Sequence, residues 1–209
     1  MKTSARAGVI LLATRSAGKL RELRPMFIAA RLAVVDLPEL GIAESSDEAE
    51  LERYETFEEN ALAKARYFHQ RTRMPVVADD SGLEVDALGK RPGVRSKRWS
   101  GRSDLSGQAL DDANNALLMQ SLRAAADRRA RYVCVAAYVD SERTLVRRGE
   151  APGIISDEPR GAGGFGYDPY FVLAGTGRTF AELSLSEKEQ LSHRGRAFTA
   201  LIRAIVGLG

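Results

Sequence analysis

Short apolar runs and longer amphipathic stretches alternate along this chain. A continuous apolar run is typical of a strand that is buried on both faces. Two of the runs flank the polar segment Asp140–Arg143, which predicts an antiparallel hairpin. We therefore expect strands at Gly8–Ala13, Leu32–Leu37, Pro75–Asp79, Arg131–Val139, Thr144–Ala151 and Pro169–Leu173.

The amphipathic stretches predict helices. Ala61, Ala65 and Phe68 recur at helical spacing and form one apolar face. Thr56 and Glu59 fit a capping box, in which each side chain accepts a hydrogen bond from the backbone of the other residue, so a helix begins there. The expected helices cover Lys19–Ala30 with Ser16 as its cap, Thr56–Thr72, Asp104–Ala126, Ser184–Ser192 and Ser192–Val206.

Three segments show neither a continuous apolar run nor apolar residues at helical spacing. Glu44–Glu55 is acidic, Gly89–Gly101 is basic and Gly161–Gly166 is glycine-rich, and we expect loops at all three. Strands and helices interleave, but the hairpin is antiparallel, so the fold class is α/β with a mixed β-sheet flanked by helices. The chain has 209 residues without a repeat or a linker. It therefore predicts a single domain over residues 1–209, with residues 1–7 disordered.

Composition narrows the function classes. An apolar fraction of 44% and a charged fraction of 28% are ordinary for a globular protein. The net charge of +3 is small and scattered, so an anionic small substrate fits it as well as nucleic acid does. The one cysteine, Cys134, lies in an apolar run, which indicates a buried thiol and excludes a disulfide within the chain. No segment is long enough to span a membrane, so we expect no membrane partner and a cytoplasmic location.

The segment Ala13–Lys19 follows a predicted strand and begins a helix. Free backbone N–H groups, the positive end of the helix dipole and Lys19 make this arrangement an anion site. It is not a Walker A loop, which has glycine in place of Ala13 and serine or threonine in place of Leu20. The segment predicts phosphate binding, and a helix start with a solvated lysine is the alternative.

Two adjacent carboxylates, Asp79 and Asp80, come directly after an apolar run. Acids at the carboxyl end of a strand are positioned to hold Mg²⁺, which prefers oxygen ligands and brings phosphates with it. Because successive strand residues point to opposite faces, we expect only one of the two to face the site. Ser81 and Gly82 would then turn the backbone toward the ligand. A capping or turn pair is the alternative.

Two segments nearer the C-terminus predict recognition of a flat ligand. Phe165 and Tyr167 alternate with glycines, which favours a stacking platform over a core strand. Asp168 follows them as a hydrogen-bonding group. His193 and Arg194, at a helix start, supply donors for a carbonyl or a phosphate. Core aromatics and a surface histidine are the respective alternatives.

Six motifs occur together in a fixed order: TRSAGK at Thr14–Lys19, TFEENALAKA at Thr56–Ala65, ADDSGL at Ala78–Leu83, RPGVRSKRWSG at Arg91–Gly101, GGFGYDP at Gly163–Pro169 and SHRG at Ser192–Gly195. With them the chain resembles the inosine triphosphatase family of noncanonical purine nucleoside triphosphate pyrophosphatases. The resemblance covers nearly the whole chain, from Gly8 to Val206. Six collinear motifs are far more specific than any one of them.

The resemblance implies a role for individual residues. Asp80 matches the residue that acts as metal ligand and proton acceptor, and it is the predicted catalytic residue. Lys64 and Lys188 match phosphate-contacting lysines, and Ser81 matches a substrate contact. The other predicted substrate-binding residues form the triphosphate loop and the base-recognition segments: Thr14, Arg15, Ser16, Ala17, Gly18, Lys19, Phe165, Gly166, Tyr167, Asp168, His193 and Arg194.

One motif departs from the family pattern. The family has Glu-Thr-Gly shortly before the Thr-Phe pair and uses that glutamate as a second metal ligand, whereas Glu52 here is followed by arginine and tyrosine. Counting back from Phe57 selects Glu52 as the second ligand beside Asp80, and Glu55 is the alternative. The resemblance also implies Mg²⁺ as cofactor, a homodimer, and an elongated α/β fold of two lobes with the active site in the cleft between them.

The implied reaction is hydrolysis of dITP, ITP, XTP or dXTP between the α and β phosphates, which removes deaminated purines from the nucleotide pool. Inosine and xanthosine carry a 6-oxo acceptor, whereas adenosine carries a 6-amino donor. Donors from Arg194 and the backbone near His193 would match the acceptor, and mispaired buried polar groups cost roughly 10⁴-fold in discrimination. Guanosine shares the 6-oxo group, so it must be rejected through its 2-amino group.

Two other functions are compatible with parts of the sequence. A Maf-like nucleotide pyrophosphatase also pairs an N-terminal phosphate loop with central acids, but the segments Phe165–Asp168 and Ser192–Arg194 argue against it. A noncatalytic nucleotide-binding or nucleic-acid-binding protein is favoured only by the basic excess and Trp99. It would bind oligonucleotides with a steep salt dependence and no metal. We therefore expect a small-molecule nucleotide as the partner, and no nucleic acid.

Overall fold

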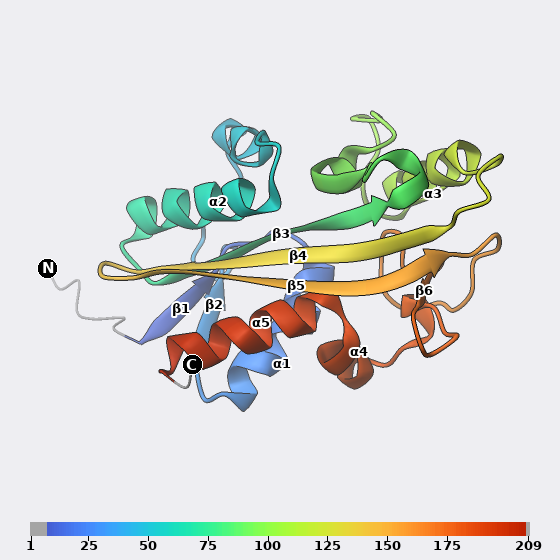
Figure 1. The fold of residues 1–209 in the computed structure, drawn as a ribbon. Coiled ribbons are helices and arrows are strands. Elements are labelled where there is room, and N and C mark those ends of the chain that lie inside the picture. Colours follow the sequence, from blue (N-terminus) through green and yellow to red (C-terminus); the bar gives the residue numbers. More distant parts are fainter. Residues whose placement is uncertain (1–7, 208–209) are drawn as a thin grey trace, which may run out of the picture. The chain divides into compact units, whose positions relative to one another are not determined.

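The computed structural model describes residues 8–207, so the disorder predicted for residues 1–7 lies outside the described residues. Within that range six strands form one sheet in the order β2-β1-β3-β4-β5-β6 (Figure 1). β1 pairs in parallel with β2 and β3, whereas β5 and β6 are antiparallel, which confirms the predicted mixed sheet. The strands are β1 (Val9–Leu12), β2 (Ala33–Asp36), β3 (Val76–Val85), β4 (Arg129–Val139), β5 (Thr144–Ile155) and β6 (Phe171–Leu173).

Helices flank these strands, and two predicted caps are confirmed. The Ser16 hydroxyl accepts a hydrogen bond from the Lys19 N–H at 3.3 Å, and the Thr56 hydroxyl accepts one from the Glu59 N–H at 3.2 Å. The first helix begins at Ala17, earlier than predicted, because the capped turn includes the residues between cap and lysine. The α-helices are α1 (Ala17–Ala29), α2 (Phe57–Thr72), α3 (Gly107–Ser121), α4 (Leu185–Leu191) and α5 (His193–Ile205).

Strand β3 differs most from its prediction. The sequence predicts an end at Asp79, but the strand continues to Val85, so the expected turn at Ser81 and Gly82 is wrong. Leu83 and Val85 are both fully buried. Continued extended backbone places these two apolar side chains in the core, and that burial stabilises the longer strand.

Two segments that the sequence predicts as loops contain 3-10 helices. η1 (Ser46–Glu52) lies in the acidic segment and η3 (Gly93–Arg98) in the basic one. At the start of η1, the Glu48 carboxylate accepts a hydrogen bond from the Ser45 N–H at 3.3 Å. Such a local side-chain-to-backbone bond leaves no hydrophobic period, so the apolar pattern did not predict the helix.

The described residues form two compact units, and the first comprises 8–80, Val135–Arg148 and 197–207. In this unit α2 lies on one side of β1 and β3, and α1 and α5 lie on the other (Figure 1). The rings of Phe27 in α1 and Phe198 in α5 meet edge to face, with their centroids 6.1 Å apart. Both rings are fully buried, so the two helices share one apolar core.

The second unit comprises Ser81–Cys134 and Gly149–Arg196, and β3, β4 and β5 each pass from one unit into the other. Cys134 is fully buried, which confirms the predicted core thiol. α3 is shorter than predicted at both ends. The core of this unit includes Leu83, Val85, Leu118, Leu122, Tyr132, Phe171 and Phe180.

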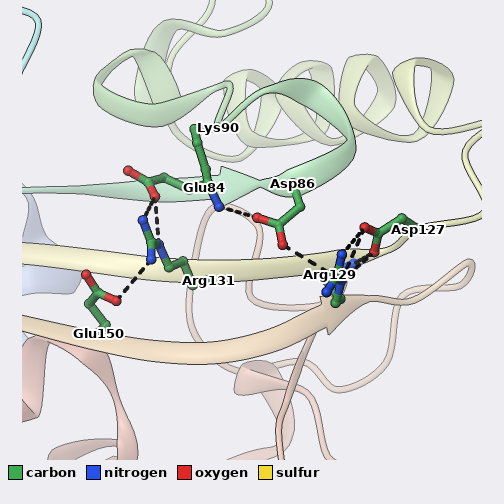
Figure 2. A network of polar contacts seen from close by, with 7 residues as sticks. All are labelled: Glu84, Asp86, Lys90, Asp127, Arg129, Arg131 and Glu150. Atoms are coloured by element: carbon green, nitrogen blue, oxygen red, sulfur yellow. Dashed lines mark hydrogen bonds and ion pairs between the residues drawn. The ribbon is translucent and has the colours of Figure 1, made fainter.

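A polar network ties neighbouring strands of the second unit (Figure 2). Arg131 in β4 pairs with Glu84 in β3 at 2.7 Å and with Glu150 in β5 at 3.4 Å. The hydrogen bond to Glu84 raises the pKa of Arg131, against the effect of burial. Because one guanidinium bridges acids on both adjacent strands, these cross-strand contacts favour the observed strand register.

Candidate active site

The loop before α1 and its first turn carry the predicted triphosphate loop. Thr14 follows β1 and is buried, and its hydroxyl accepts a hydrogen bond from the Ser16 N–H at 3.2 Å. Ser16 caps the helix, while Ala17 and Gly18 form the first turn. The N–H groups at a helix start and the ammonium of Lys19 are donors of the kind that bind phosphate.

Arg15 makes a different set of contacts. Its Nε and Nη2 donate to the two carboxylate oxygens of Glu48 at 2.8 and 2.6 Å, and its Nη1 donates to the Ile42 carbonyl at 3.0 Å. The bidentate hydrogen bond raises the pKa of Arg15 and lowers the pKa of Glu48. Because Glu48 lies in η1, Arg15 connects the triphosphate loop to the segment that ends at Glu52.

The two acids of β3 are buried and alternate across the strand. Asp79 is 1% exposed, and its Oδ2 pairs with Lys19 Nζ at 2.9 Å. Asp80 is 6% exposed, and its Oδ2 accepts a hydrogen bond from Asn60 Nδ2 at 2.9 Å. Since both acids lie inside a regular strand, the alternative of a capping or turn pair is wrong.

Asn60 joins Asp80 to the segment that follows Glu52. Its Nδ2 also donates to the Tyr54 carbonyl at 3.2 Å, and its Oδ1 accepts from the Tyr54 N–H at 2.9 Å. The side chain is completely buried. The sequence prediction of the site did not include Asn60. The available signal was its spacing of four residues from Lys64, which places both on one face of α2.

Lys64 lies among the acids of the first unit. It forms an ion pair with Glu52 and donates to the Asp79 carbonyl oxygen at 3.1 Å. Burial opposes the charge on Lys64, but Glu52, Asp79 and Asp80 outweigh it and raise the pKa of Lys64. Burial raises the pKa of Asp80 to about 6, Lys64 opposes this rise, and Glu52 adds to it. Glu52 and Asp80 thus repel each other.

This set of acids fits a magnesium ion that arrives with phosphate. Within residues 8–207, no three His, Cys, Asp or Glu side chains cluster closely enough to hold a metal by themselves. Mg²⁺ is commonly bound by only one or two carboxylates together with substrate phosphates and water. Asp80 and Glu52 supply two carboxylates, and a cation would relieve their repulsion.

In the second unit, Arg194 organises part of the predicted base-recognition group. Its Nη2 donates to the Ser81 hydroxyl at 3.0 Å, and its guanidinium lies over the ring of Phe165, 5.5 Å from the centroid. Arg194 is 5% exposed, whereas Phe165 is half-buried. The cation-π contact therefore fixes the orientation of a ring that remains partly accessible.

Asp168 accepts several hydrogen bonds within the same unit. Its Oδ2 accepts from Lys188 Nζ at 2.6 Å and from the Phe165 N–H at 3.1 Å, and its Oδ1 accepts from the Tyr132 hydroxyl at 3.3 Å. Both Asp168 and Lys188 are buried. The predicted phosphate-contacting Lys188 therefore pairs with an acid of the base-recognition segment, and this charge-assisted bond holds the turn that carries Phe165.

His193 is buried in a stack of rings. Its imidazole lies 4.6 Å from the Tyr132 ring at 9°, and Tyr132 lies 5.3 Å from Phe180 at 2°. The alternative of a surface histidine is therefore wrong.

Tyr167 is also buried, and its hydroxyl donates to the Ser96 carbonyl at 2.8 Å. Desolvation raises the pKa of Tyr132 well above its ordinary value.

Each unit thus gathers its own share of the predicted residues. The first brings acids together with lysines, and the second brings rings together with one buried ion pair. Sequence reasoning missed the residues that hold these groups in place, because their partners are distant in the chain. The missed residues are Asn60, Ser96, Asp111, Asn115 and Tyr132.

The mixed sheet and the acid–lysine centre are those of an α/β protein equipped for phosphate chemistry. The chain belongs to the Ham1 family, whose sequence model matches residues 10–204. It is 48% identical over 201 residues to the dITP/XTP pyrophosphatase of Mycobacterium tuberculosis, covering 95% of this chain and 96% of the relative. It is 46% identical over 196 residues to the dITP/XTP pyrophosphatase of Burkholderia pseudomallei, covering 92% and 91%.

Solved structures agree with this assignment and confirm the resemblance found in the six motifs. The Ham1 protein of Staphylococcus aureus matches with a TM-score of 0.81 and 35% identity, over 96% of this chain and all of that one. A nucleoside-triphosphatase, dITP/XTP pyrophosphatase, from Mycobacterium abscessus matches with a TM-score of 0.70 and 42% identity, over 92% and 97%. Among the described residues, no helix is both long and apolar enough to cross a membrane.

Proposed function

We propose that the protein hydrolyses noncanonical purine nucleoside triphosphates, dITP, ITP, XTP and dXTP, to the monophosphate and pyrophosphate. The observation that carries this proposal is the centre in the first unit, where Asp79, Asp80 and Glu52 lie with Lys19 and Lys64. Buried acids and lysines together suit a magnesium-bound polyphosphate better than either kind alone. The names of the relatives supply the substrate class.

Asp80 and Glu52 would hold Mg²⁺, which offsets phosphate charge and makes a water molecule more acidic. Glu52 is preferred over Glu55 because Glu52 pairs with Lys64 and acts on the pKa of Asp80, whereas the side chain of Glu55 is exposed. Asp80 would accept the proton of the attacking water. Without metal, burial raises the pKa of Asp80 to about 6, and a bound cation would lower it again, so the carboxylate would be charged near neutral pH.

The lysines would stabilise charge on the phosphates. Lys19, at the start of α1, and Lys64, in α2, would transfer part of their contacts from acids of the protein to oxygens of the triphosphate. The N–H groups of Ala17 and Gly18 would bind the same anion at the helix start. These donors act on the α–β bridging region and on the leaving pyrophosphate, where negative charge increases during the reaction.

The second unit would supply recognition of the purine. Phe165 presents a half-buried ring, and Arg194 and His193 contribute donors for a 6-oxo group. Asp168, held by Lys188, keeps the backbone of Phe165 in place. A 6-amino group would bring donor against donor, and such mispairing costs roughly 10⁴-fold in discrimination.

Pyrophosphate release from dITP, XTP, dGTP and dATP, measured with and without Mg²⁺, tests this function. We expect Mg²⁺-dependent turnover of dITP and XTP and little turnover of the other two. Equal turnover of all four would leave a pyrophosphatase but contradict the proposed recognition of the base. No turnover, together with salt-sensitive oligonucleotide binding, would favour the noncatalytic binding protein instead.

The proposal includes a homodimer, which rests on the family resemblance, and a cytoplasmic location, which rests on the expectation that no segment spans a membrane. Light scattering coupled to size-exclusion chromatography would measure the mass in solution. A mass twice that of the 209-residue chain is expected, and a monomer that is fully active would contradict the dimer.

A further inference from the structure

α3 carries two side chains that hold the predicted base-recognition segment, and neither belongs to the site predicted from sequence. Asp111 Oδ2 accepts a hydrogen bond from the Gly166 N–H at 2.7 Å. Asn115 Nδ2 donates to the Gly166 carbonyl oxygen at 3.0 Å. Because the two residues are four positions apart, they lie on one face of the helix. One helix face thus binds both backbone polar groups of Gly166.

These two contacts are made away from bulk water. Asn115 is 7% exposed and Asp111 is half-buried. Burial raises the pKa of Asp111, and the hydrogen bond from Gly166 opposes that rise. Gly166 has a φ of +63°, a conformation that residues with a side chain rarely adopt. Glycine adopts positive and negative φ about equally well, so the two side chains hold one of several backbone conformations that Gly166 could adopt.

The residues on either side of Gly166 are held as well. The Phe165 N–H donates to Asp168, and the Tyr167 hydroxyl donates to the Ser96 carbonyl. Loss of the contacts at Gly166 would leave Phe165 and Tyr167 held by their own hydrogen bonds, but would release the backbone between them. Phe165 and Tyr167 adjoin Gly166 on either side, so a shift of its backbone would be passed to both aromatic side chains.

Building on the function proposed above, we propose that Asp111 and Asn115 are positioning residues that orient the Gly166 peptide and thereby set the selectivity for the purine base. They act through Phe165 and Tyr167 and need no contact with substrate. Displacement of a binding group by about 1 Å can cost roughly 10²-fold in rate, even when the change lies far from the chemistry.

Kinetics of Asp111→Ala, Asn115→Ala and the double variant test the proposal. Asp112→Ala is the matched control, because Asp112 is the next residue on α3, is exposed, and accepts a hydrogen bond from Gln108. We expect the ratio of kcat/KM for dITP to that for dGTP to fall at least about tenfold in each single variant, mainly through KM for dITP. The control keeps the wild-type ratio.

Two further measurements separate positioning from general stability. The loss of selectivity in the double variant should be smaller than the product of the two single losses, because both side chains act on the backbone of one residue. Asp111→Asn retains an acceptor for the Gly166 N–H and should recover most of the selectivity. Amide exchange at Gly166 should be at least about tenfold faster in Asp111→Ala than in the wild type, at equal Tm.

The proposal is overturned if both alanine variants keep the wild-type ratio, or if they lose turnover of all four nucleotides equally in step with a fall in Tm. Failure of the proposed function has a different signature. In that case the wild type turns over none of the nucleotides. Faster amide exchange at Gly166 in Asp111→Ala would then still establish that Asp111 holds the backbone of Gly166. Unchanged amide exchange would reject this.

Discussion

The two units hold their functional groups in different ways. In the first, the charged groups pair with one another: Lys19 with Asp79, and Lys64 with Glu52. In the second, the recognition segment is held mainly through its backbone, as at Gly166 and Phe165. Under the proposed function, the first arrangement would exchange partners when a metal and phosphates bind. The second is formed in advance, and a preformed site loses less entropy on binding.

Under the proposed function, this difference separates the groups that would act on the phosphates from the groups that would recognise the base. The charges of Lys19, Asp79, Lys64 and Glu52 can be retained in this centre without substrate, because each has an internal partner of opposite charge. A backbone that is held by side chains presents a shape that does not depend on the ligand. Substitutions in the first unit should therefore change metal dependence and kcat, whereas substitutions in the second should change the choice of base.

The largest effect is expected for Asp80→Asn, which removes the proposed metal ligand and base. We expect kcat/KM for dITP to fall at least about 10³-fold, since a general base alone contributes 10²–10⁴-fold. The same change should stabilise the metal-free protein. Burial raises the pKa of Asp80 from 3.8 to about 6, so above pH 6 the folded state holds a disfavoured charge.

The sign of this effect can be checked by measuring the free energy of unfolding of both proteins as a function of pH. The folded carboxyl binds its proton more tightly than the unfolded one, so its destabilising effect is complete above pH 6 and disappears as the pH falls to about 4. Asp80→Asn should be more stable than wild type by ~1–3 kcal/mol at pH 8 without metal. Urea unfolding in EDTA measures this, and a less stable variant at pH 8 would contradict the account.

Two glycines of the second unit, Gly164 and Gly166, differ in the space around them. A Cβ at Gly164 would collide with the Asp168 carboxylate and lie 2.7 Å from Lys188 Nζ, whereas a Cβ at Gly166 meets nothing within 4 Å. Both have positive φ. We expect Gly164→Ala to lower the free energy of unfolding by ~3–5 kcal/mol, because it breaks a buried ion pair.

Gly166→Ala adds only the backbone strain, so its expected cost is ~1–2 kcal/mol. Denaturant unfolding of both variants gives the comparison. Equal losses would show that the Lys188–Asp168 pair does not stabilise the second unit as described.

A smaller effect is expected for Asn60→Ala in the first unit. Asn60 holds Asp80 and the backbone of Tyr54, so its loss should weaken Mg²⁺ activation by ~10–100-fold, the usual effect of removing a support of a metal ligand. The Mg²⁺ dependence of kcat and calorimetric Mn²⁺ binding measure this. Gln70→Ala, an exposed change on the same helix, is the control. Unchanged metal affinity in Asn60→Ala would reject its positioning role.

The smallest effect is expected at the hairpin turn. Burial raises the pKa of Asp140, but hydrogen bonds from the Tyr138 hydroxyl and the N–H groups of Glu142 and Arg143 outweigh it and lower the pKa to about 2. Its stabilisation is complete above pH 4 and is lost as the pH falls to about 2. Asp140→Asn should cost less than ~1 kcal/mol at pH 7, because solvent screens the pair with Arg143. The unfolding curves of wild type and variant should differ slightly at pH 7 and converge as the pH approaches 2, and activity should not change.

Local chemistry allowed much of the fold to be predicted from sequence. The cap at Ser16 and the capping box at Thr56 depend on residues three positions apart, and both are confirmed. The hairpin around Asp140 follows from its turn residues. The end of β3 could not be predicted this way, because the longer strand is stabilised by burial of Leu83 and Val85 against residues that lie elsewhere in the chain.

The same limit applies to the site. The motifs identified the residues that carry charge and rings, and their individual roles stay predictions until the variants are measured. Their supports were missed: Asp111 lies 55 residues from Gly166, and no local pattern links the two. The contacts of Arg15 with Glu48, 33 residues away, also could not be predicted from the sequence. Such long-range polar contacts depend on tertiary packing, which single-sequence patterns do not describe.

One competition experiment tests the central claim most directly. An equimolar mixture of dITP and dGTP is incubated with the enzyme and Mg²⁺, and the products are identified by ³¹P NMR and chromatography. The account predicts dIMP and pyrophosphate, with dGTP left intact until dITP is consumed. Formation of dIDP and inorganic phosphate would place the cleavage at the wrong bond, and equal consumption of both nucleotides would contradict the proposed recognition of the base.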